Sequence, residues 1–104
     1  MSDAELSSLR SDIADIDAKI FDLIKIRMEL CEKVRKYKIE RDMPTQTYLA
    51  ESSMIEKSRA RARKANLYEE LITNLYLSLI KYSVLRQSEL IHSESDETKQ
   101  SPDN

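Results

Sequence analysis

A periodic stripe of apolar side chains between Leu6 and Ile39 constrains the fold more than any other feature of this chain. Its members recur in alternating steps of three and four residues: Leu6, Leu9, Ile13, Ile16, Ile20, Leu23, Leu30, Val34 and Tyr37. This spacing predicts one long amphipathic helix that packs on other helices. We expect it to end near Arg41, after roughly 38 residues or about 57 Å. Because no other segment is long enough to cover it, we expect the helix to span two protomers.

Two cations interrupt this apolar stripe. Arg27 occupies the position that the spacing assigns to an apolar residue between Leu23 and Leu30. A guanidinium in such a position costs several kcal/mol unless it meets negative charge. Lys38 follows 11 residues later, within about 20° of the same face and roughly 16 Å along the axis. The helix therefore directs two cations toward whatever packs against it.

The remaining chain predicts more helices and no sheet. Among its 104 residues there is no glycine, and hairpin turns depend on glycine, asparagine and aspartate. Pro44 should end the first helix, a second should cover about 47–64, Asn66 should break the chain, and a third should cover about 68–91. We expect an all-α domain over residues 1–91 and a disordered acidic tail over 92–104, which lacks apolar anchors. A three-helix chain this thin should associate with a second copy.

Composition excludes several classes of function. The formal net charge is −2, which gives no general signal for nucleic acid or membrane binding. We interpret the basic end of the second helix as a solvated face. The single cysteine, Cys31, fits a reducing cytoplasm and more often packs than reacts. Without a histidine or cysteine cluster or a glycine-rich loop, the sequence predicts no metal or nucleotide cofactor.

Polar residues in the third helix and an arginine in the first leave two questions open. Ser83 and Gln87 are polar members of a helical stripe that also includes Tyr76 and Ile80. This end of the helix is therefore either more exposed to solvent or faces a polar cavity. With Arg27 and Lys38, a cavity would suit a small anion. Arg10 lies about 25 Å from Arg27 and is turned by about 100°. Spacing alone favours an exposed Arg10, but two antiparallel copies could bring Arg10 of one to Arg27 of the other.

Taken together, these residues carry a resemblance. The order and spacing resemble the all-helical chorismate mutase family at Arg10, Arg27, Lys38, the Pro44 loop, Glu51 and the run Ser83-Val84-Leu85-Arg86-Gln87. The likeness covers about residues 6–90. It implies a three-helix protomer in an intertwined homodimer with two active sites, each taking one arginine from the partner. It also implies conversion of chorismate to prephenate by a Claisen rearrangement, without metal, cofactor or covalent intermediate.

The resemblance assigns a role to each matching residue. It implies that Arg27 and a second chain's Arg10 hold the two substrate carboxylates, with support from Ser83. Lys38 and Gln87 would hydrogen-bond the ether oxygen. Glu51 would hold the ring hydroxyl. A dianionic substrate gives the inward cations a purpose, and a unimolecular reaction needs no pair of nucleophile and base.

Two positions depart from the family pattern. Thr47, a candidate substrate-binding residue, stands where an aspartate is common near the ring hydroxyl, and Ala50 stands where an arginine commonly binds a carboxylate. Close relatives act on 4-amino-4-deoxychorismate or cleave pyruvate from isochorismate, whereas the retained Glu51 favours chorismate. The remaining alternative is a non-enzymatic helical dimer, such as a regulatory or scaffolding module. Such a dimer would gain nothing from Arg27 in its apolar stripe.

Overall fold

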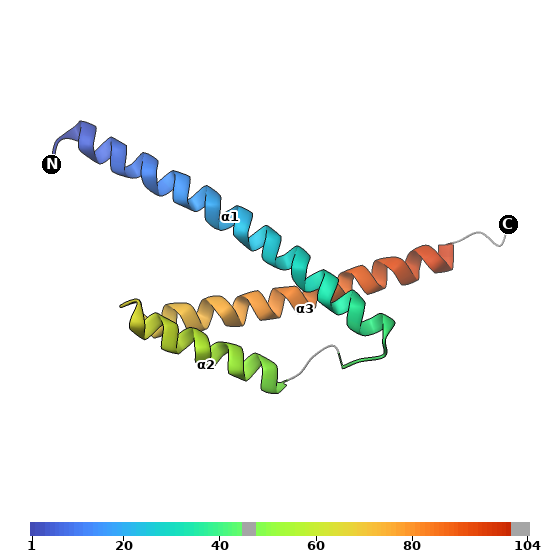
Figure 1. Cartoon of the computed structure of the whole chain (residues 1–104). Coiled ribbons are helices and arrows are strands. Elements are labelled where there is room, and N and C mark those ends of the chain that lie inside the picture. Colours follow the sequence, from blue (N-terminus) through green and yellow to red (C-terminus); the bar gives the residue numbers. More distant parts are fainter. Residues whose placement is uncertain (45–47, 101–104) are drawn as a thin grey trace. The chain divides into compact units, whose positions relative to one another are not determined.

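A computed structural model describes the backbone of residues 1–44 and 48–100. Within that part the chain forms α1 (Asp3–Glu40), α2 (Tyr48–Lys64) and α3 (Glu69–Gln100), and no strand (Figure 1). The predicted all-α class and very long first helix are confirmed. The chain divides into two compact units, Met1–Val34 and Arg35–Asn104, so the last residues of α1 belong with α2 and α3.

Helix α1 begins at a side-chain cap. The backbone N–H of Glu5 donates to Ser2 Oγ at 3.2 Å, and the N–H of Leu6 donates to the Ser2 carbonyl at 3.0 Å. Ser2 is therefore the N-cap residue, a position that serine favours. The acidic Asp3 and Glu5 lie in the first turn, where the helix dipole favours negative charge.

Helices α1 and α2 end in the same backbone motif. Asp42 and Asn66 have positive φ angles of 54° and 57°. After α1, the N–H of Met43 donates to the Lys38 carbonyl at 2.8 Å, and after α2 the N–H of Leu67 donates to the Ala62 carbonyl at 2.9 Å. In each case the N–H of the sixth residue donates to the carbonyl of the first, which is the Schellman motif. This motif usually places glycine at the left-handed position. In a chain without glycine, aspartate and asparagine take that position because they tolerate it best.

Helices α2 and α3 pack against each other and run in opposite directions (Figure 1). Ala62 of α2 is the buried hydrophobic residue of the described part, with 3 % of its surface exposed. Its small side chain allows two helices to approach closely. The break predicted at Asn66 is confirmed, and it lets α3 start at Glu69.

The apolar stripe of α1 is largely uncovered in the single chain. None of the residues of α1 is buried. Ile13, Ile16 and Leu23 expose 58 %, 54 % and 65 % of their surfaces. No described helix combines the length and apolar composition required to cross a bilayer.

The C-terminal end of helix α3 lies beyond the predicted one. The sequence placed its end near Ile91, whereas the helix continues to Gln100. The reason is local: the segment contains good helix formers such as glutamate, lysine and glutamine, and proline first interrupts it at Pro102. The division into a domain ending at residue 91 and a tail stays a prediction, and residues 101–104 lie outside the described part.

Candidate functional site

Arg27 and Arg10 lie on α1 in the first compact unit. Arg27 is half-buried, and its Nη1 donates to Cys31 Sγ at 3.8 Å, one turn further along the helix. A thiol is a weak, neutral acceptor, so this contact helps to orient the guanidinium. Arg10 is exposed, as spacing alone favoured for a single chain. The pairing of these two arginines across a dimer belongs to the proposal below.

Lys38 lies in the last turn of α1, within the second unit. Its side chain is half-buried, whereas its neighbours Tyr37 and Ile39 are exposed. Its carbonyl oxygen accepts from the N–H groups of Arg41, at 3.2 Å, and Met43. The terminal motif therefore fixes the backbone from which the ammonium group extends. The negative end of the helix dipole also favours a cation here.

Glu51 and Ser83 come from the two other helices of the same unit. Glu51 is half-buried in the first turn of α2, where the positive end of the helix stabilises its carboxylate. Ser83 of α3 is buried, with 8 % of its surface exposed. Its burial does not fit a solvent-exposed helix end at this residue, while the polar cavity and the role of Ser83 in it stay predictions. Buried hydroxyls require hydrogen-bond partners, so Ser83 marks a polar place in an otherwise apolar helix face.

Two predicted site residues are described only in part or not at all. Thr47 lies outside the described residues. Gln87 follows Ser83 by one helical turn in α3, but its side chain lies outside the described part. Ala50, the position that departs from the family pattern, is exposed in the first turn of α2.

Sequence reasoning missed Arg35. This residue is half-buried, and its Nε atom is buried without a hydrogen-bond partner among the described residues. It lies three residues before Lys38, so both side chains project from one face of α1. That spacing could have identified it, but the run Lys33-Val34-Arg35-Lys36 resembles a solvated basic segment.

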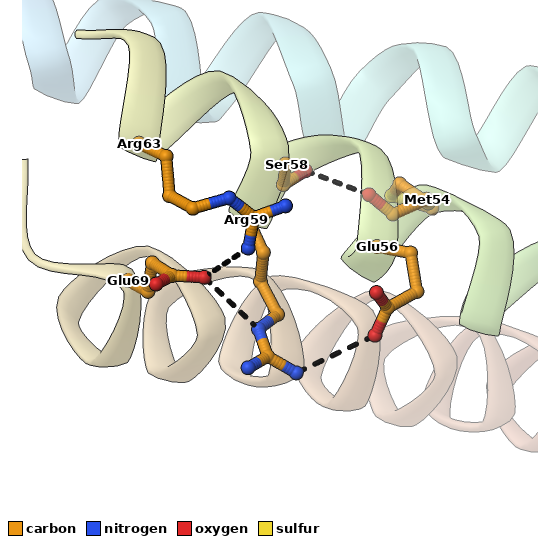
Figure 2. Close-up of polar contacts among 6 residues, drawn as sticks. All are labelled: Met54, Glu56, Ser58, Arg59, Arg63 and Glu69. Carbon is orange, nitrogen blue, oxygen red and sulfur yellow. Dashed lines mark hydrogen bonds and ion pairs between the residues drawn. The ribbon is translucent and has the colours of Figure 1, made fainter.

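Two arginines near the basic end of α2, Arg59 and Arg63, form ion pairs. Figure 2 shows Glu69, at the start of α3, accepting from Arg63 and facing Arg59 Nε at 3.7 Å. The second interaction is an ion pair too long for a hydrogen bond, which agrees with an Arg59 Nε that has no hydrogen-bond partner. Arg59 also contacts Glu56 at 3.4 Å. These contacts tie the end of α2 to the start of α3 and suit a structural role.

No metal site is visible among the described residues, where no group of three or more histidine, cysteine, aspartate or glutamate side chains could hold an ion. Within the second compact unit, the half-buried cations Arg35 and Lys38 and the buried Ser83 are groups that can bind an organic anion. Electrostatic attraction and hydrogen bonding are what such groups supply.

A comparison with known protein families finds one family whose model covers these residues. The model of the family described as chorismate mutase type II matches residues 9–88. The chain belongs to this family. The match includes all seven positions predicted for the site, from Arg10 to Gln87. The resemblance inferred from sequence is thereby confirmed, whereas the individual roles of the residues stay predictions.

Two curated relatives within this chorismate mutase family are bifunctional proteins. The bifunctional chorismate mutase/prephenate dehydratase of Buchnera aphidicola subsp. Schizaphis graminum is 33 % identical over 88 residues, which cover 85 % of this chain and 23 % of the relative. The protein of the same description from Buchnera aphidicola subsp. Acyrthosiphon pisum is 33 % identical over 95 residues, covering 91 % and 25 %. The chain therefore spans about a quarter of the length of these curated relatives.

Proposed function

We propose that the protein is a chorismate mutase, which converts chorismate to prephenate by an intramolecular Claisen rearrangement. The observation that carries the proposal is the family match over residues 9–88, which includes every candidate site residue. The half-buried cations Arg27 and Lys38 and the buried Ser83 support it. Chorismate mutase is one of the two activities in the names of both bifunctional relatives.

The proposed mechanism uses position and charge. The ether C–O bond of chorismate breaks while a new C–C bond forms within the same molecule, so no group enters or leaves. The protein accelerates this step by holding the compact conformer through its two carboxylates. Arg27 binds one carboxylate and Arg10 of a second chain binds the other.

Charge stabilisation at the ether oxygen is the second part of the mechanism. Negative charge grows on that oxygen as the bond breaks, and a fixed cation stabilises the transition state more than the bound substrate. Lys38 supplies this charge, with Gln87 as a second donor. Glu51 holds the ring hydroxyl and Ser83 supports a carboxylate. Thr47, in place of an aspartate, makes a neutral contact near the ring.

The proposed assembly is a homodimer in which α1 of each chain packs against its counterpart. The uncovered apolar stripe of α1 supports this arrangement, because Ile13, Ile16 and Leu23 each expose more than half of their surfaces in the single chain. We place the protein in the cytoplasm, where Cys31 stays a free thiol. We assign it no nucleic-acid or membrane partner.

The test is an assay of purified protein with three substrates in separate incubations: chorismate, 4-amino-4-deoxychorismate and isochorismate. Products are identified by chromatography and NMR, with heat-inactivated protein as the control for spontaneous reaction. Rearrangement of chorismate to prephenate is the expected result. Exclusive turnover of aminodeoxychorismate, or release of pyruvate from isochorismate, would assign the alternative that Thr47 and Ala50 favour. No turnover of any of the three would leave the non-enzymatic helical dimer.

A further inference from the structure

Arg35 combines burial with an unsatisfied donor. It is half-buried, whereas Lys33, Val34, Lys36 and Tyr37 around it are exposed. Its Nε atom is buried and has no hydrogen-bond partner in the part of the chain that the structure describes. Leaving a buried charged donor unsatisfied destabilises a folded protein. A ligand that accepts from this donor would remove the cost; the corresponding atom of Arg59 instead faces Glu69 in an ion pair.

The cation Lys38 next to Arg35 indicates an anionic ligand, although Glu32, three residues before Arg35, is a half-buried carboxylate on the same helix. Arg35 and Lys38 are three residues apart on one face of α1, both half-buried and both in the second compact unit. Like charges at this spacing repel each other. An anion that binds between them removes the repulsion and satisfies the free Nε donor. A guanidinium presents Nε and a terminal nitrogen side by side, a geometry that matches the two oxygens of a carboxylate.

We propose that Arg35 is a further substrate-binding residue and holds a carboxylate of the chorismate substrate next to Lys38. This inference rests on the proposed function. It also accounts for Ala50, because a second source of guanidinium replaces the arginine that the resemblance places at that position. Helices α1 and α2 contribute Arg35 and Ala50 to the same compact unit.

The test compares Arg35→Met with Lys36→Met. Both variants remove one positive charge from α1, but Lys36 is exposed. Methionine keeps the unbranched stem of the side chain, so packing is largely preserved. Arg35→Met should raise KM for chorismate between about 10- and 100-fold, as expected for a lost hydrogen bond to a charged group. Its kcat should change less, because the carboxylate is bound equally in substrate and transition state. Lys36→Met should match the parent protein.

Thermal unfolding separates binding from a structural role. Removing an unsatisfied buried charge should leave the Tm of Arg35→Met unchanged or higher. A marked fall in Tm or loss of dimer would instead show that Arg35 is paired within the protein and would overturn the inference. Arg35→Lys provides the charge-retaining comparison: it should raise KM less than Arg35→Met.

A second substitution tests whether Arg35 replaces the arginine that the family commonly has at the position of Ala50. Ala50→Arg introduced into Arg35→Met should lower KM back toward the parent value. If Arg35→Met and Lys36→Met have the same KM, Arg35 does not bind the substrate and the inference fails. The proposed function would still stand in that case, because the parent protein converts chorismate. If the parent protein turns over none of the three substrates, the proposed function fails and this inference fails with it.

Discussion

At the scale of single residues, Lys38 combines a half-buried side chain with a backbone that the end of α1 holds in place. Its carbonyl oxygen accepts two backbone hydrogen bonds from the turn that closes α1, at 3.2 Å and 2.8 Å. These bonds fix the backbone while the side chain stays half-buried. A cation held in this way needs little reorganisation when charge develops on a bound substrate, which is the condition for strong electrostatic catalysis.

We predict that Lys38→Ala lowers kcat for chorismate by roughly 10²–10³, the scale of losing one donor to a developing oxyanion. KM should change less, because the contact strengthens in the transition state. Alanine is the best helix former, so α1 should keep its stability. Steady-state kinetics and circular dichroism measure both effects, with the exposed Lys36→Ala as the matched control. A change confined to KM would remove Lys38 from the ether oxygen.

The site residues differ in how far sequence could predict them. Arg27 and Lys38 were identifiable because each lies on a stripe of otherwise apolar residues, and Ser83 because a polar group interrupts an apolar helix face. Arg35 was not, since its neighbours in sequence are basic and exposed. Its burial depends on what packs against α1, which helical spacing does not encode. Glu51 was identified through resemblance alone.

At the scale of elements, the helix ends depend on two residues at positive φ. Asp42 and Asn66 occupy the left-handed position of the Schellman motifs that end α1 and α2. The second motif sets the turn that allows Arg63 and Glu69 to pair. The chain breaks near Pro44 and Asn66 could be predicted from sequence because both residues disfavour helix continuation. The end of α3 could not, since helix formers continue beyond the last apolar residue.

We predict that Asn66→Gly raises the free energy of unfolding by about 0.5 kcal/mol, because glycine adopts a positive φ without the steric cost that a side chain brings. Asn74→Gly is the matched control: Asn74 is exposed within α3, where glycine should lower stability by a few tenths of a kcal/mol. Urea unfolding at one fixed protein concentration measures both. If both variants lose stability equally, the left-handed position does not limit the stability of the turn.

The last residues of α3 provide a second prediction at this scale. Residues after His92 contain no apolar side chain that could dock, so a helix there depends on local propensity alone. Truncation after Ile91 should therefore leave Tm and kcat within experimental error. Thermal unfolding and the chorismate assay check this, with the full chain as the reference. A loss of several degrees in Tm would show that the segment packs in the assembled protein.

At the scale of the whole molecule, the single chain buries little apolar surface. Among the described residues no large side chain is fully buried, and Ala62 is the buried hydrophobic residue. In the proposed dimer the stripe of α1 would supply further apolar surface, and a second copy would offer the same stripe in return. Such a self-complementary arrangement is the usual basis of a two-fold dimer. The sequence predicts this association only from helix length, and it stays a prediction, since the partner's register is not encoded in a single chain's spacing.

The shared site gives the decisive prediction for this dimer. If Arg10 and Arg27 act on one substrate from different chains, Arg10→Ala and Arg27→Ala should each be nearly inactive alone. Refolded together in equal amounts, they should recover about a quarter of the parent activity. Random pairing makes about half of the dimers mixed, and each mixed dimer has one site with both arginines and one with neither. Chorismate turnover measures the recovery, and different affinity tags on the two variants verify that mixed dimers form.

The matched control refolds Arg10→Ala with the double variant Arg10→Ala/Arg27→Ala. Mixed dimers form equally well, but no site then contains both arginines, so activity should stay at the level of the single variants. Sedimentation across micromolar dilution should show no folded monomer, because the α1 stripe is covered only by a second chain. Mixed dimers that form and stay inactive would place the two arginines in separate sites. A stable helical monomer would contradict the dimer itself, since the apolar surface of α1 would then need no partner.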